Sequence, residues 1–249
     1  MSEITCKLTR GERIAKKKIE LRQGRAAVTG NESDIRTVYL TFDDGPSPNT
    51  ARILSILKQH QIPATFFVIG SDTEFAGRMY RRIVDEGHAL GNHTYSHDYE
   101  TIYQSPEAFM ADVIKLQDFL EDITDFRPRV FRFPAGSNNR IHQQVQSENP
   151  YLMIEIMQAL REKGLPYFDW NVSSTDAAEV TLDADIIISN TFLHLSGHRN
   201  AIILFHDSAP KTTTMEALPA IIQGLKDRGY TFKTLSPDSF YVHFHHLVL

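Results

Sequence analysis

From residue 37 onward, short apolar runs alternate with longer stretches in which apolar residues recur every three or four positions. The short runs are rich in Val, Ile, Leu and Phe, which is typical of buried strands. They lie at residues 38–42, 65–69, 89–91, 130–133, 167–170, 201–205 and 230–233. The stretches between them have the helical period, and several end at a glycine. Strands that alternate with helices in this way predict a parallel sheet, either doubly wound or closed into a barrel.

Polar residues of unusual type lie at or just past the carboxyl ends of five of these predicted strands. They are Asp43 and Asp44, His93 and His97, Arg132, Asp169, and His206. A barrel gathers the carboxyl ends of its strands around one pocket. An open sheet concentrates its site at one switch point and would leave several of these residues far apart. We therefore expect an α/β barrel.

Length and composition are those of one folded domain with a sizeable core. The 249 residues are within the roughly 200–250 that α/β barrels use as a single unit, and 41% of them are hydrophobic. No stretch approaches the ~18 consecutive apolar residues of a transmembrane helix. Residues 1–19 carry charges where an export signal needs an apolar core. The single Cys6 excludes an intrachain disulfide and a thiolate metal cluster.

The first 36 residues differ from the rest in charge. They hold nine Lys and Arg against five Asp and Glu, whereas residues 37–249 hold 17 against 26. We therefore separate a basic N-terminal lead-in, residues 1–36, from a folded domain of residues 37–249. A weak contact with a membrane or a cell wall is one interpretation of the lead-in, and a solvated segment is the simpler one. The net charge of −5 argues against nucleic-acid binding, and no pattern indicates a protein partner.

Two motifs together supply ligands for a metal ion. Asp43-Asp44-Gly45 follows the first predicted strand, and His93 lies four residues before His97, a spacing that places both imidazoles on one side of a helical turn. Alone, Asp-Gly is a turn dipeptide, and an isolated His-x-x-x-His pair is often incidental. Jointly they offer one carboxylate and two imidazoles, the open three-ligand set of a catalytic divalent-metal site, with a second carboxylate beside it. A structural zinc site would need a fourth ligand, and none is evident locally.

Five motifs along the chain resemble, in order, those of the NodB-type polysaccharide deacetylases, carbohydrate esterase family four. They are Thr41-Phe42-Asp43-Asp44-Gly45, His93-Thr94-Tyr95-Ser96-His97, Arg132-Phe133-Pro134, Asp169-Trp170 and Leu204-Phe205-His206-Asp207. The last three have ordinary structural explanations when each is taken alone, but the full order is hard to obtain by chance. The resemblance spans residues 37–235. It implies that residues 37–249 form a catalytic domain with a distorted (β/α)7 TIM-like barrel fold.

The resemblance implies a role for each polar residue. Asp44, His93 and His97 would hold one divalent ion, with Zn²⁺ preferred and Co²⁺, Mn²⁺ or Ni²⁺ as alternatives. Asp43 would be the general base and His206 the general acid.

Two further residues would support this chemistry. Arg132 would orient Asp43, and Asp169 would pair with His206.

Three residues are expected to contact the substrate. By the resemblance, Trp170 and Leu204 would shape the pocket for the acetyl methyl group. Family members commonly carry Tyr after the Arg-Phe-Pro motif, and the backbone N–H of that residue is thought to complete the oxyanion hole. Here the residue is Ala135. The N–H remains, but the aromatic side chain that forms one wall of the sugar site is lost. The glycan substrate of Tyr-bearing relatives is therefore not assigned to this chain.

The sequence therefore predicts a metal-dependent hydrolase that releases acetate from N-acetylglucosamine residues of a polysaccharide, either peptidoglycan or a chitin-like oligomer. An O-acetyl esterase acting on xylan or another acetylated glycan is the alternative. A non-catalytic glycan-binding barrel ranks third, because a decayed relative should have lost Asp43 or His206, and both are present. The resemblance implies an extracellular or cell-envelope location, although no export signal is visible.

Overall fold

The computed structural model describes residues 35–145 and 149–245, so the predicted lead-in lies outside the described residues except at its end. The strands are β1 (Arg36–Asp43), β2 (Thr65–Val68), β3 (Ala89–Asn92), β4 (Val172–Ser173), β5 (Asn200–His206) and β6 (Tyr230–Phe232). The helices are α2 (Thr50–His60), α3 (Glu74–Asp85), α4 (Tyr99–Ile102), α5 (Pro106–Thr124), α6 (Ile141–Gln144), α7 (Leu152–Glu162), α8 (Ala184–Leu195) and α9 (Thr212–Asp227). Among the described helices, none has the length and hydropathy needed to cross a membrane.

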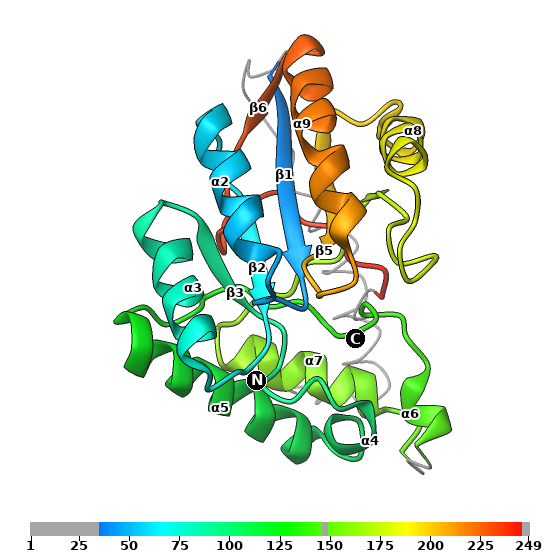
Figure 1. Ribbon diagram of the computed structural model, residues 1–249. Helices are drawn as coiled ribbons and strands as arrows, with labels where there is room; N and C mark the ends of the chain where they lie inside the picture. The colour runs from blue at the N-terminus through cyan, green and yellow to red at the C-terminus, as the bar shows by residue number, and fades with distance from the viewer. Residues whose placement is uncertain (1–34, 146–148, 246–249) are drawn as a thin grey trace, which may run out of the picture. The chain divides into compact units, whose positions relative to one another are not determined.

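The strands form one parallel sheet with β1 at its centre (Figure 1). They lie in the order β3-β2-β1-β5-β4, and β6 pairs with the first residues of β1. All of these strand pairs are parallel. The predicted α/β class with a parallel sheet is therefore confirmed.

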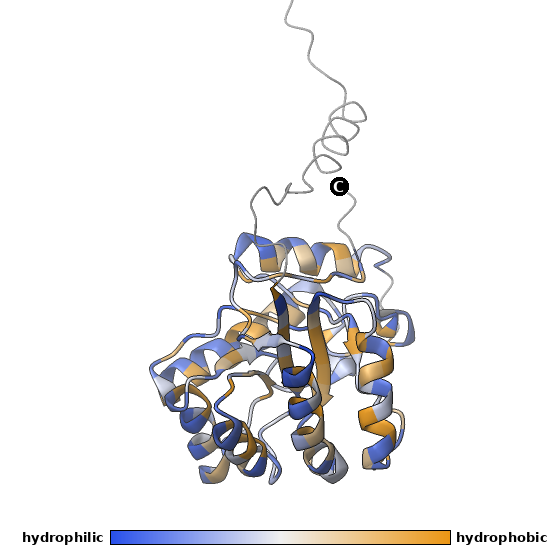
Figure 2. Ribbon diagram, turned by 90° about the horizontal axis from the view of Figure 1, so that it is seen from above, coloured by the Kyte–Doolittle hydropathy of each residue, from blue (hydrophilic) through white to orange (hydrophobic). Residues whose placement is uncertain are grey.

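The two faces of β1 have different surroundings because successive side chains of a strand point to opposite sides. Val38, Leu40 and Phe42 belong to the main hydrophobic core, together with apolar residues of α2, α3, α8 and α9. Tyr39 belongs to a second, smaller cluster on the other face. Figure 2 shows the resulting pattern, with hydrophobic strands at the centre and helices that alternate between hydrophobic and hydrophilic residues. Asp43 shares the second face with Tyr39, so it points away from the main core.

Two of the predicted strands are reduced to single bridges. Phe131 pairs with Asn92 on one side and with Tyr167 on the other. The strand expected at residues 167–170 is instead formed by Val172–Ser173, which pair with β5. The ring of strands is therefore open among the described residues, and its distortion is concentrated between residues 130 and 173.

Backbone chemistry explains this opening. Pro134 and Pro166 lack the N–H group that a continuous ladder requires. Farther on, the N–H of Asp169 donates to the carbonyl of Val242, 2.9 Å away, and so pairs with the end of the described chain rather than with a neighbouring strand.

Candidate active site

The register of the central strands brings Asp43 and His206 side by side. Asp43 ends β1 and is paired with Phe67 of β2 on one side and with His206, the last residue of β5, on the other. Parallel strands end at the same edge, so the loops after β1, β3 and β5 meet there (Figure 1). This edge collects the polar residues that the sequence places after the strands.

The turn after β1 directs Asp44 toward this edge. Its backbone is left-handed (φ 72°), a conformation that Asp tolerates better than most residues. A side chain at the next position would clash, because a Cβ on Gly45 would lie 2.4 Å from Oδ2 of Asp207. Asp207 accepts hydrogen bonds from the hydroxyl groups of Ser47 (3.1 Å) and Thr50 (2.6 Å). The turn is thus fastened to the end of β5.

The histidine loop is held by side chains that the sequence interpretation did not single out. Asn92 accepts a hydrogen bond from the N–H of Thr94 (2.9 Å). Asp112 of α5 accepts two more, from the backbone N–H groups of residues 95 and 96, at 2.6 and 2.9 Å. The backbone is left-handed at Thr94 and His97 (φ 70° and 51°). The spacing of His93 and His97 therefore acts through a bent loop and not through the expected helical turn.

Asp44, His93 and His97 bring one ligand atom each to the same place. Oδ1 of Asp44 lies 3.5 Å from Nε2 of His93 and 3.4 Å from Nε2 of His97. The three ligand atoms all lie within 4.8 Å of one another. Ligands at ~2.0–2.1 Å from a tetrahedral zinc ion are about 3.3 Å apart. The donor set and its spacing therefore fit a small divalent ion.

The protonation of these groups also suits metal binding. Nδ1 of His93 donates to the carbonyl of Arg132 (2.8 Å), because a carbonyl can only accept, and this leaves the Nε2 lone pair for a metal. Burial, with a contribution from His93, lowers the pKa of His97 and favours its neutral form. Burial acts to raise the pKa of Asp44, but His93, His206 and His97 outweigh it and hold that pKa well below its usual range. An ionised carboxylate and a neutral imidazole are the forms that bind metal ions.

Asp43 faces a guanidinium group that is held rigidly. Nη1 of the fully buried Arg132 donates to Oδ1 of Asp43 at 2.9 Å. The same guanidinium donates to Oγ1 of Thr41 (2.6 Å) and to the carbonyl of Phe168 (2.9 Å). Oδ2 of Asp43 lies 3.8 Å from Nε2 of His93, beside the ligand cluster. The structure therefore places Arg132 next to Asp43, where the resemblance expects it.

The expected pairing of Asp169 with His206 is wrong. The carboxylate of Asp169 instead accepts hydrogen bonds from the backbone and hydroxyl of Ser137 and from the N–H of Phe244. His206 is paired with Asp176, whose Oδ1 lies 2.7 Å from Nδ1 of His206 and whose Oδ2 accepts the N–H of His206 (2.8 Å). The cause is the displaced strand: because β4 is at residues 172–173, the acid that follows its end is Asp176.

The sequence gives little indication that Asp176 is a functional residue. It follows a run of small polar residues, Ser173-Ser174-Thr175, and no aromatic neighbour draws attention to it. Its position becomes evident only from the register of β4 with β5, in which Ser173 is paired with Leu204.

The pair formed by Asp176 and His206 keeps the imidazole charged. Burial alone would lower the pKa of His206, but the hydrogen bond and charge of Asp176, helped by Asp43 and Asp44, raise it to about 9. His206 is therefore a cation at neutral pH, directly beside Asp43 in the sheet.

Comparison with known proteins agrees with this geometry. The family model described as polysaccharide deacetylase matches residues 30–154. A putative polysaccharide deacetylase of Bacillus subtilis is 34% identical over 211 residues, covering 84% of this chain and 70% of that protein. This chain belongs to the polysaccharide deacetylase family. The resemblance stated from the motifs is thus confirmed, and with it the enzyme class, hydrolases that act on the C–N bonds of N-acetyl groups.

Two further relatives bear on fold and substrate. The catalytic domain of a peptidoglycan N-acetylglucosamine deacetylase from Eubacterium rectale has a solved structure with a TM-score of 0.79 and 32% identity, covering 85% of this chain and 93% of that one. A bifunctional xylanase/deacetylase of Pseudobutyrivibrio xylanivorans is 32% identical over 224 residues, 86% of this chain and 33% of that protein. The family implies an acetylated glycan as substrate. The Eubacterium rectale domain shares the fold of this chain, which in these deacetylases is a distorted barrel.

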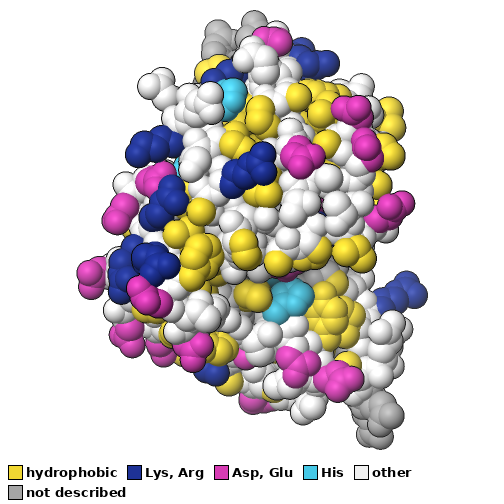
Figure 3. All heavy atoms as spheres, viewed as in Figure 1, with side chains coloured by type: hydrophobic (Ala, Val, Ile, Leu, Met, Phe, Trp, Pro, Cys, Tyr) yellow, Lys and Arg dark blue, Asp and Glu magenta, His cyan; other side chains and the backbone are white. Residues whose placement is uncertain are grey.

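Three residues that the resemblance gives to a deacetylase substrate pocket lie around this edge. Ala135 is exposed, its backbone is left-handed (φ 64°), and its N–H has no hydrogen-bond partner among the described residues. Leu204 is two residues before His206 on β5, so both point to the same face of the sheet. Trp170 is half-buried, with its ring 5.7 Å from the guanidinium carbon of Arg132. In Figure 3 a histidine side chain lies in a hollow flanked by hydrophobic side chains, where Figure 1 places the ends of β1 and β5.

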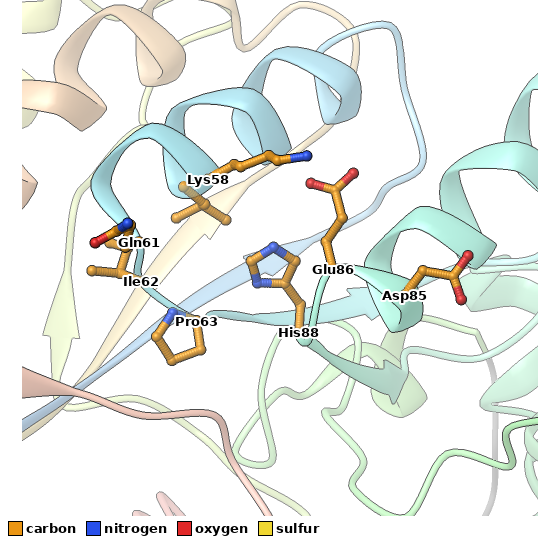
Figure 4. Close-up of a pocket in the computed structure, with 8 residues that line it drawn as sticks. Lys58, Gln61, Ile62, Pro63, Asp85, Glu86 and His88 are labelled. Atoms are coloured by element: carbon orange, nitrogen blue, oxygen red, sulfur yellow. The ribbon is translucent and has the colours of Figure 1, made fainter.

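A second hollow, of about 420 Å³, lies at the opposite edge, before β2 and β3 (Figure 4). Nε2 of His88 and Oε2 of Glu86 are buried there without hydrogen-bond partners among the described residues. The N–H of Ala64 donates to Nδ1 of His88 (3.2 Å), so Nε2 carries the proton and cannot bind a metal.

Proposed function

We propose that this protein removes acetyl groups from N-acetylglucosamine residues of a polysaccharide, in peptidoglycan or a chitin-like oligomer. The observation that carries the proposal is the juxtaposition of three groups at one sheet edge. A fixed carboxylate, Asp43, lies between a three-ligand cluster suited to a divalent ion and a charged imidazole, His206. Water activation and leaving-group protonation are both available at this edge.

The metal site is the first element of the proposal. Asp44, His93 and His97 would hold the ion, with Zn²⁺ as the preferred identity because two imidazoles and a carboxylate in an open set suit it. When bound, such an ion supplies Lewis-acid polarisation of the acetyl carbonyl and lowers the pKa of a water molecule.

Asp43 is the proposed general base. The bond from Arg132 occupies Oδ1 and fixes the orientation of the carboxylate, while Oδ2 faces the ligand cluster. Oδ2 would take the proton of the attacking water as its oxygen bonds to the acetyl carbon. The N–H of Ala135, which has no partner among the described residues, would donate to the developing oxyanion.

His206 is the proposed general acid, with Asp176 as its partner. When the C–N bond breaks, the sugar nitrogen must leave as an amine, which requires a proton. His206 carries that proton at neutral pH, and Asp176 holds Nδ1, so Nε2 is the nitrogen that donates it. The products are acetate and a glucosamine residue.

Ester cleavage on acetylated xylan is the second candidate, because one relative is a xylanase/deacetylase. The hydroxyl oxygen of a sugar residue is a better leaving group than an amine nitrogen, and its departure depends less on protonation. Removal of His206 should therefore reduce amide cleavage more than ester cleavage. A His206→Gln variant separates the two activities within one active site.

The experiment is a panel of acetate-release assays. Purified protein loaded with Zn²⁺ is incubated with N-acetylglucosamine oligomers, peptidoglycan and acetylxylan, alongside Asp43→Asn. We expect release from the first two and a loss on the order of 10²–10⁴-fold in Asp43→Asn with the metal retained. Release from acetylxylan alone would replace deacetylation with the esterase function. Unchanged turnover in Asp43→Asn would remove that residue as the base.

The metal site has its own test, independent of turnover. Zinc content measured by elemental analysis should be near one ion per chain and should be lost in the double variant His93→Ala/His97→Ala. Ser55→Ala, at an exposed position of α2, is the control and should retain the ion. Full zinc content in the double variant would show that the ligands lie elsewhere.

We further propose that the protein acts in the cell envelope or outside the cell, because peptidoglycan is found there. Cell fractionation with detection of the full-length protein checks this, and recovery in the cytosolic fraction alone would contradict it.

A further inference from the structure

The last described residues of the chain lie along the segment that precedes β4. The carbonyl of Val242 accepts the N–H of Asp169, and the hydroxyl of Tyr167 donates to the carbonyl of His245 (2.8 Å). The ring of Tyr167 stacks on His243, with centroids 3.9 Å apart. We call residues 240–245 the C-terminal segment. Neither the ligand cluster nor the proton-transfer groups use it.

Asp169 joins the C-terminal segment to the loop that follows Arg132. Its fully buried carboxylate accepts the N–H (2.9 Å) and the hydroxyl (2.5 Å) of Ser137 and the N–H of Phe244 (2.8 Å). The Ser137 hydroxyl in turn accepts the N–H of His245 (3.0 Å). Hydrogen bonds to a buried carboxylate are strong, so the loop and the segment are held in one arrangement.

This arrangement places two aromatic rings over the loop. The rings of Phe244 and Trp170 meet edge to face, with centroids 4.8 Å apart and planes at 82°, a geometry that aromatic pairs prefer. A Cβ on Gly136 would lie 3.2 Å from Trp170 and 3.5 Å from Phe244. Phe244 is nevertheless 37% exposed. An exposed ring held by its own backbone and by a neighbouring ring is already ordered for contact with a ligand.

The two rings adjoin the catalytic residues. Trp170 lies beside the guanidinium of Arg132, which binds Asp43. Gly136, beneath both rings, follows Ala135, whose N–H is proposed to face the oxyanion. The rings therefore border the place where the acetyl group would react.

We propose that Phe244 adds an aromatic wall to the substrate groove beside Trp170, which the resemblance already assigns to the substrate, that a sugar ring of the bound glycan packs on this wall, and that Asp169 positions it. The proposal rests on the proposed function, because a polymeric glycan supplies more than one sugar ring at the site. A pyranose ring presents C–H groups on its faces and hydroxyl groups at its edge. Aromatic side chains match the faces, as they do in ligand sites generally. A wall without charged groups also suits an uncharged N-acetylated sugar.

Trp170 makes the wall directly observable, since it is the only tryptophan of the chain. Its fluorescence should change when a sugar ring packs against it. The titration uses the full chain carrying Asp43→Asn, so that a hexamer of N-acetylglucosamine binds without being cleaved. Acetate release by the chain with Asp43 intact is measured separately, with kcat and KM for the same hexamer.

The variants are Phe244→Leu, Phe244→Tyr and a matched control, Phe240→Ala. Phe240 lies in the same segment and is 38% exposed, against 37% for Phe244, but no ring contact of it is found among the described residues. Leu keeps the apolar bulk without the ring, so folding should be preserved. We expect Phe244→Leu to weaken hexamer binding and to raise KM by about tenfold while kcat changes less than about threefold. Phe244→Tyr and Phe240→Ala should stay within about twofold of the parent chain.

The outcomes separate the wall from the proposed function. Equal affinity in Phe244→Leu and the parent chain would overturn the wall, even if acetate is released normally. An equal weakening in Phe240→Ala would also overturn it, because the effect would not be specific to the ring. Hexamer binding that depends on Phe244, without acetate release by the intact chain, would support the wall and contradict the proposed deacetylation.

Discussion

Two buried carboxylates, Asp169 and Asp176, lie seven positions apart, and each accepts three hydrogen bonds. Asp169 binds the backbone N–H and the hydroxyl of Ser137 and the backbone N–H of Phe244. Asp176 binds the backbone and the imidazole of His206 and the hydroxyl of Thr214 (3.0 Å). Only Asp176 therefore faces an imidazole, a side chain whose charge it can control. Burial and the number of hydrogen bonds do not distinguish the two acids, whereas the kind of donor does.

The largest effect should come from Asp176→Asn. The amide cannot supply the negative charge that raises the pKa of His206, so burial would dominate and the imidazole would lose its proton at lower pH. We expect kcat for the glycan at pH 8 to fall on the order of 100-fold. The alkaline fall in rate, expected near pH 9 in the parent chain, should move to lower pH. A pH profile of kcat measures both effects.

Asp169→Asn is the matched control for this prediction. Asp169 is as buried as Asp176 and lies in the same region, but its carboxylate contacts no titrating group. The alkaline fall in kcat of Asp169→Asn should therefore occur at the same pH as in the parent chain. If Asp169→Asn moved the alkaline fall in kcat as far as Asp176→Asn does, the conclusion that only Asp176 controls the charge of His206 would be wrong.

The second prediction concerns stability. The pKa of His206 is raised in the folded state, from an ordinary 6.5 to about 9, so the pair stabilises the fold fully below pH 6.5. This contribution is lost as the pH rises through about 9. It amounts to at most roughly 3 kcal/mol. The difference in unfolding free energy between the parent chain and His206→Gln, measured by urea denaturation, should therefore be larger at pH 6 than at pH 10. A difference that grows with pH would contradict the sign.

The smallest effect should come from Asp169→Asn on substrate binding. The amide can still accept one hydrogen bond from Ser137, but its NH₂ group would oppose the N–H of Phe244, which would loosen the aromatic wall. We expect KM for the hexamer to rise about threefold with kcat nearly unchanged, which corresponds to a few tenths to 1 kcal/mol of binding free energy. Steady-state kinetics at fixed pH measures this. If kcat became more sensitive to pH, or if it fell by a larger factor than KM rose, the result would instead indicate that Asp169 acts in the chemical step.

The fold and most of the candidate site could be predicted because their signals are local. The alternation of short apolar runs and longer helical stretches indicates the parallel α/β class. The positions at or just past the predicted strand ends single out six polar residues, Asp43, Asp44, His93, His97, Arg132 and His206. The strands at 130–133 and 167–170 could not be predicted correctly. Their composition is that of buried strands, but prolines and the C-terminal segment interrupt their ladders.

The sequence by itself determined which residues are available for chemistry and at which edge of the sheet they lie, because strand ends and turn residues depend on neighbours along the chain. Tertiary structure alone decided which acid meets His206, because this follows from the register of β4 against β5. It also decided that Phe244 stands beside Trp170, since the backbone N–H of Phe244 is satisfied by Asp169, 75 positions earlier. Hydrogen bonds over such separations leave no periodic trace in the sequence, and they form only when the folded chain brings their donors and acceptors together.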